Sequence, residues 1–77
     1  MEAFQERMVN EYKELKDRVE KLENFINENP LYDKLDKKER IYQVWQLAGM
    51  RNYRAALVNR LIHQGIMPTD DNNSDGK

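Results

Sequence analysis

The sequence contains no cysteine among its 77 residues, which excludes disulfide bonds and thiolate metal sites. Its one histidine, His63, is too few for a metal centre built on imidazoles, and its one serine, Ser74, has no base beside it to activate it. The three glycines stand apart, so no glycine-rich phosphate loop is present. We therefore expect no enzyme activity, no metal site and no cofactor.

Long apolar runs and a strong net charge are also missing. No apolar stretch approaches the ~18 residues that a membrane span needs, and the first residues include acids and lack the apolar segment of a secretion signal. The formal net charge of -1 provides no general attraction to nucleic acids or anionic lipids. We therefore expect a cytoplasmic protein with no nucleic-acid partner and no membrane partner.

The first half of the chain has the pattern of one long helix over about 2–28. Its apolar residues recur at spacings of four and three, the period of a helix that packs along one seam. This first-helix seam consists of Met8, Tyr12, Leu15, Val19, Leu22 and Ile26. The residues between them are nearly all charged, as on the water-facing side of a soluble helix.

Asn29 and Pro30 interrupt this pattern, because proline disfavours helical backbone in the residue before it. The same pair resembles an N-cap and first helical position, which predicts a short helical turn within 29–36. The polar, aperiodic segment 67–77 predicts a disordered tail after a hairpin domain of residues 1–66.

A second helix is predicted over about 37–64. Asp36, followed three residues later by Glu39, has the pattern of a capping box at its start, and Gly65 is suited to end it. Gly49, in its interior, costs about 1 kcal/mol relative to alanine. We interpret Gly49 as room for the close approach of a neighbouring helix or a ligand.

The second helix carries more apolar surface than one partner helix covers. Its first stripe consists of Ile41, Val44, Ala48, Ala55, Val58 and Ile62. Its second stripe consists of Met50, Tyr53, Leu57 and Leu61, with Tyr42 and Trp45 beside it. We expect the first stripe to pack on the first-helix seam and the second stripe, with Tyr42 and Trp45, to form an oligomer interface. The predicted fold is all-α, an antiparallel two-helix hairpin with a short helical turn that assembles into a helical homo-oligomer.

The candidate ligand site is an arginine and aromatic cluster on the second helix. Arginine presents a fork of donors to phosphate, and flat aromatic rings stack on bases. The cluster consists of Arg51, Arg54, Tyr53, Trp45 and Asn52. An alternative remains open, in which Arg51 pairs with an acid of the first helix, such as Glu20 or Glu23, and the aromatic rings belong to an interface core.

The first-helix segment FQERMVNEYKELKDRVEKLENFI, together with Gln46, Met50, Tyr53, Leu57 and Arg60, resembles a family of short bacteriophage proteins related to a small protein of a crAss-like phage. The resemblance covers residues from about 3 to 64 and implies a phage origin without an activity. In size and layout the chain is also similar to the helical-hairpin domain of phage sponge proteins, which oligomerise and sequester the cyclic nucleotide signals of antiphage immunity. That similarity is one of architecture, so it transfers no ligand residue.

Two functional hypotheses follow. The first is a phage-encoded, non-enzymatic immune-evasion protein that sequesters a small anionic signal, such as a cyclic oligonucleotide, in the host cell cytoplasm. The second is a helical protein–protein interaction module, either an inhibitor of a host defence protein or a phage assembly adaptor. Calorimetry with cyclic nucleotides and pull-down from a host lysate distinguish the two.

Overall fold

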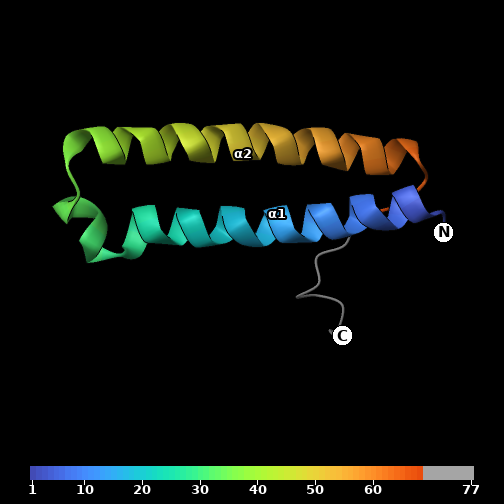
Figure 1. Cartoon of the computed structure of the whole chain (residues 1–77), viewed down its shortest axis with the longest axis horizontal. Coiled ribbons are helices and arrows are strands. Elements are labelled where there is room, and N and C mark those ends of the chain that lie inside the picture. The colour runs from blue at the N-terminus through green and yellow to red at the C-terminus, as the bar shows by residue number, and fades with distance from the viewer. Residues whose placement is uncertain (69–77) are drawn as a thin grey trace.

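The computed structural model describes residues 1–68 and consists of two long antiparallel helices joined by a short helical turn (Figure 1). Helix α1 spans Ala3–Glu28, the 3₁₀ helix η1 spans Pro30–Lys34, and α2 spans Lys37–His63. No strand occurs within residues 1–68, so the prediction of an all-α fold with two helices is confirmed. From residue 69 onward, the tail predicted over 67–77 lies outside the described residues.

The turn between the helices is fixed by side chains that cap the helix starts. The Asn29 Oδ1 atom accepts a hydrogen bond from the Leu31 N–H at 2.9 Å, and the Asp36 Oδ1 atom accepts one from the Glu39 N–H at 2.8 Å. Each interaction satisfies one backbone donor that has no partner inside its helix. The Glu39 carboxylate accepts a hydrogen bond from Gln43 Nε2 at 3.0 Å, so only the Asp36 half of the predicted capping box is seen.

Helix α2 ends at His63, and the glycine two residues later has left-handed backbone. Gly65 has a φ of 77°, which side-chain-bearing residues rarely adopt. This geometry lets the Gly65 N–H donate to the Ile62 carbonyl and the Ile66 N–H donate to the Leu61 carbonyl, both at 2.9 Å. These two hydrogen bonds form a Schellman motif, and Ile66 then packs against the core.

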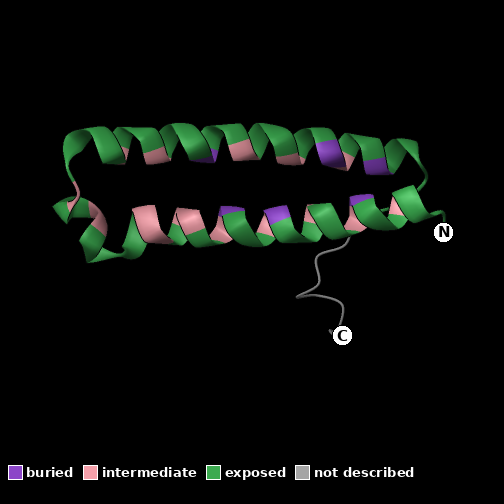
Figure 2. Ribbon diagram, viewed as in Figure 1, coloured by how far each residue is buried: buried purple, intermediate pink, exposed green. Residues whose placement is uncertain are grey.

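The core lies between the two helices, and the buried and intermediate parts of the two ribbons face each other (Figure 2). From α1, the first-helix seam faces α2 as predicted, with Met8, Leu15 and Val19 buried and its other members partly buried. From α2, the core receives Leu47, Leu57 and Leu61, with Met50 packed beside them.

The prediction that the first stripe packs on α1 is wrong. Ile41, Val44 and Ile62 remain 38%, 47% and 53% exposed, so the first stripe lies mainly on the outer side of α2. The prediction that Leu57 and Leu61 form an oligomer interface is also wrong, because each is 1% exposed inside the hairpin. The physical reason is side-chain size. The stripe that contains leucines buries more apolar area against α1 than the stripe that contains Ala48 and Ala55.

Gly49 lies on the exposed surface of α2, and a Cβ atom added there meets nothing within 4 Å. Close approach to another part of the described hairpin is therefore not the reason for this glycine. We expect Gly49→Ala to raise the free energy of unfolding by up to about 1 kcal/mol, measured by urea denaturation, because alanine restricts the unfolded chain and favours helix.

The matched control for this substitution is Gly65→Ala. The positive φ of Gly65 strains an alanine, so this variant should lose stability. If Gly49→Ala instead lowers stability, a second chain or a ligand approaches α2 at Gly49.

Candidate functional site

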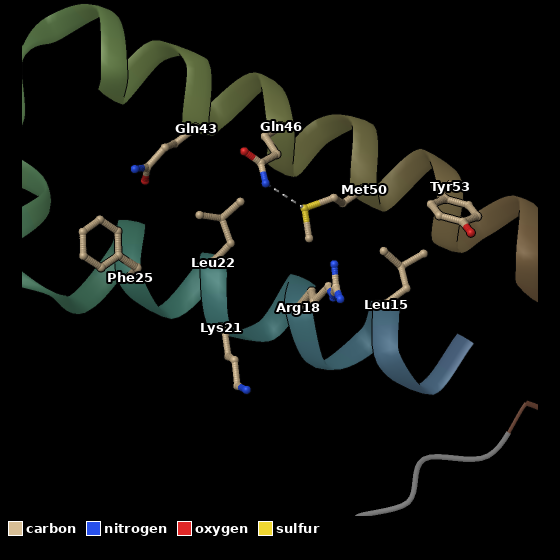
Figure 3. Close-up of a pocket in the computed structure, with 9 residues that line it drawn as sticks. All are labelled: Leu15, Arg18, Lys21, Leu22, Phe25, Gln43, Gln46, Met50 and Tyr53. Carbon is tan, nitrogen blue, oxygen red and sulfur yellow. Dashed lines mark hydrogen bonds between the residues drawn. The ribbon is translucent and has the colours of Figure 1, made fainter. Parts of the chain in front are cut away.

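A groove of about 650 Å³ lies along one side of the contact between α1 and α2 (Figure 3). Both helices contribute to it, and most of its lining is apolar or aromatic. The lining residues are Leu15, Arg18, Lys21, Leu22, Phe25, Gln43, Gln46, Met50 and Tyr53. A concave, mostly apolar surface with a few polar groups is the usual form of a small-molecule site.

The apolar lining of the groove is an extension of the core. Leu15 is a core residue, and Leu22 and Met50 pack against the core from opposite helices. Phe25 borders the groove near the turn, where its ring packs edge-on against the Tyr32 ring with 6.2 Å between centroids. The groove is therefore built on the contact between two helices and not on a loop.

The polar groups of the groove are only partly paired. The buried Oε1 atom of Gln43 has no hydrogen-bond partner within residues 1–68. Gln46 makes one weak contact, from its Nε2 atom to the sulfur of Met50 at 3.9 Å. A buried acceptor without a partner costs free energy, and this atom is too enclosed for a ligand in the groove to reach it unless the Gln43 side chain moves.

The cationic group that faces the groove is Arg18. Its guanidinium points towards the side of Met50, whereas the Lys21 side chain points away from α2 (Figure 3). Lys21 also forms an ion pair with Asp17 at 2.9 Å. No hydrogen bond or ion pair joins Arg18 to another of residues 1–68, so its donors are free to meet a ligand.

The distribution of charge along the groove is uneven. From Arg40 to Pro68 the sequence has no aspartate or glutamate, but the Glu39 carboxylate of α2 accepts a hydrogen bond from the groove residue Gln43. On the α1 side, Glu11 and Glu14 line a smaller hollow together with Arg18 and Tyr53. An anion in the groove is therefore favoured beside Arg18 on the side of Met50, away from both Glu39 and that hollow.

A comparison with protein families identifies the chain. The sequence model of Sequestin matches residues 2–63, which include both helices and the turn. The chain belongs to the Sequestin family. A search of curated proteins and a search of solved structures gave no match.

The structure separates the five residues that were proposed from the sequence as a ligand site. Tyr53 lines the groove, but Arg51, Asn52 and Trp45 do not. Arg54 is half-buried and is not among the groove residues either. Successive residues of an α-helix point about 100° apart, so neighbours in sequence lie on different sides of α2.

The partners of the separated residues are specific. The Arg51 guanidinium contacts the Glu23 carboxylate of α1, which confirms the alternative reading of Arg51 as an ion-pair residue. Trp45 packs against Tyr42, with ring centroids 5.3 Å apart. Trp45 also borders a second hollow near the turn, together with Tyr32 and Arg40.

Sequence reasoning missed Arg18, Phe25 and Gln43 as groove residues of this Sequestin chain. The signal was present in the first helix. Arg18 lies three residues after Leu15 and four before Leu22, and these spacings place its side chain on the same side as both leucines. A charged residue in that position borders the helix contact, where a groove between two helices opens.

A metal-binding cluster and a membrane-spanning helix are both absent from the described residues. Within residues 1–68, no group of three or more His, Cys, Asp and Glu side chains is placed to hold a metal ion. None of the helices in that range is long and apolar enough to cross a membrane.

Proposed function

We propose that this protein is non-enzymatic and that it binds and holds a small anionic molecule in the groove between α1 and α2. The name of the Sequestin family suggests a sequestering function. The observation that carries the proposal is the groove itself, in which an unpaired arginine of α1 and a tyrosine of α2 border an apolar lining. Holding a ligand requires binding alone, so no catalytic group is needed.

The groove chemistry fits a ligand that has both a phosphate and a flat ring. Arg18 supplies a planar fork of donors for phosphate oxygens. Tyr53 supplies an aromatic face or edge on which a base can pack. These features together favour a nucleotide-like ligand, and a cyclic oligonucleotide is the class we propose.

The biological setting is part of the same proposal. The resemblance to short phage proteins supports a phage-encoded protein that works in the host cell cytoplasm and removes a nucleotide signal of antiphage immunity. We also propose that the protein works as a homo-oligomer, because its core has only six buried residues in the described chain and a single hairpin of this size is marginally stable.

Isothermal titration calorimetry of the full chain tests the ligand proposal. The panel consists of cyclic dinucleotides, cyclic trinucleotides, and linear mononucleotides and nucleoside diphosphates as comparators. We expect saturable binding of at least one cyclic compound, with weaker binding of mononucleotides. Absence of heat across the panel, with protein shown to be helical by circular dichroism, would remove the proposal.

A second candidate function is a protein–protein interaction module that inhibits a host defence protein or serves as a phage assembly adaptor. The exposed pair of Tyr42 and Trp45, beside Ile41 and Val44, favours it, because aromatic residues are enriched at interfaces. Pull-down from a host lysate tests this function. Specific retention of one host protein, together with silence in calorimetry, would favour the module over the sequestering protein.

A further inference from the structure

The side of α2 that faces away from α1 is exposed (Figure 2), and it carries a line of apolar residues that the rest of residues 1–68 leaves largely uncovered. This line is the first stripe, which runs for about 30 Å between Ile41 and Ile62 at the rise of an α-helix. Val44 is 47% exposed and Ile62 is 53% exposed. Its spacing of three and four residues is the period of a helix that packs lengthwise on another helix.

The first stripe, with Arg51 at its centre, reads the same in both directions. The order is isoleucine, valine, alanine, arginine, alanine, valine and isoleucine, at positions 41, 44, 48, 51, 55, 58 and 62. A line of side chains with this symmetry is complementary to a second copy of itself that runs in the opposite direction. Such a pairing has a two-fold axis, which is the commonest symmetry of soluble oligomers.

The charge at the centre of the stripe is compatible with this pairing. Two unpaired arginines that meet at a two-fold axis would repel each other. Here the Arg51 guanidinium contacts the Glu23 carboxylate of its own chain, so each copy brings one positive and one negative group to the axis. Each Arg51 charge is therefore balanced within its own chain, which removes the repulsion that two unpaired arginines would have.

The side chains next to the centre allow the helices to approach closely. Ala48 and Ala55 stand on either side of Arg51, and both are exposed. The distance between packed helices falls as the side chains at the contact become smaller. The larger Ile41 and Ile62 then meet at the two ends, where they keep water from the contact.

We propose that two copies of the chain pair in antiparallel fashion through the first stripe. In this pair, Ile41 lies opposite Ile62 of the second copy, and Ala48 lies opposite Ala55 of the second copy. The inference rests on the homo-oligomer in the proposed function, and it is independent of the ligand.

The absence of native cysteine makes a disulfide test direct. Three variants are compared under mild oxidation: Ala48→Cys, Ala55→Cys, and the double variant with both changes. In the antiparallel pair, equivalent positions of Ala48 lie about 10 Å apart along the helix axis, which is too far for a disulfide. We therefore expect a cross-linked dimer as the main product of the double variant and mostly uncross-linked chain from each single variant.

Matched controls and a second measurement keep the outcomes separate. The double variant Ala48→Cys with Ala56→Cys places its second thiol on another side of α2 and should not cross-link.

Light scattering on the wild type reports assembly through any face of the protein. Efficient cross-linking of each single variant would replace the antiparallel pair with a parallel one, and a dimer without cross-links would place the interface elsewhere. A folded monomer would overturn both this inference and the proposed oligomer, whereas calorimetry alone decides the ligand.

Discussion

Leu57→Ala should lower the free energy of unfolding by about 3 kcal/mol, because a buried leucine that becomes alanine leaves a cavity in the core. Leu57 is 1% exposed and lies in the core between the helices. The loss should be the same at low and high protein concentration, since it acts within one chain. Urea denaturation followed by circular dichroism at two protein concentrations measures it.

Ile62→Ala is the matched control, because it removes a similar aliphatic side chain only five residues later on α2. Ile62 is 53% exposed, so its loss within one hairpin should stay below about 1 kcal/mol, with any further loss appearing only at concentrations where chains associate. A larger intrinsic effect for Ile62→Ala than for Leu57→Ala would mean that the first stripe faces α1 after all. If Leu57→Ala fails to fold, Leu57→Val provides the same comparison with a smaller loss.

Arg18→Glu should weaken binding of the preferred cyclic nucleotide by about 10- to 100-fold, because it replaces a donor to phosphate with a repelling charge. Arg18 lines the groove and makes no hydrogen bond or ion pair within residues 1–68. Its substitution should therefore leave helix content and the unfolding midpoint nearly unchanged. Calorimetry with the nucleotide identified on the wild type gives the affinity.

Lys21→Glu imposes the same change of charge one turn away, on a side chain that points away from α2 (Figure 3). Its affinity should change less than about threefold at physiological salt, where exposed charges are screened. Equal effects from the two variants would show that the ligand responds to the overall charge of α1 and not to a site at Arg18.

The packing face of the first helix could be predicted from the sequence because the helix has a single apolar face. Met8, Leu15 and Val19 recur at heptad spacing among charged residues, so only one face of α1 can enter a core, and this face does. The caps at Asn29 and Asp36 were also predictable, because they depend on local hydrogen bonds to residues two and three positions away.

The orientation of the second helix could not be predicted from its pattern. Two stripes compete for α1, and the stripe that wins includes the polar Gln43 and Arg54 among its half-buried neighbours. The rejected stripe is more uniformly apolar but contains small alanines. Which stripe packs on α1 depends on the total apolar area that each would bury against that helix. The spacing of apolar residues within α2 alone does not give this area.

The candidate site depended on this orientation. With α2 rotated as the structure has it, Tyr53 faces the same groove as Arg18, while Arg51 turns to Glu23. The ion pair of Arg51 was predictable as an alternative, because an arginine within a packed face needs an acid nearby. Because the groove is formed by two helices, its prediction from the sequence required the correct packing face of each helix.

The groove and the first stripe share no residue of α2. A chain can therefore be paired with its neighbour and keep its groove open to solvent. Under the proposed function, in which the protein captures its ligand without turnover, this separation determines how much ligand the protein can hold. Each copy of 9.3 kDa would hold one molecule, so the amount of signal removed would rise in proportion to the number of chains made.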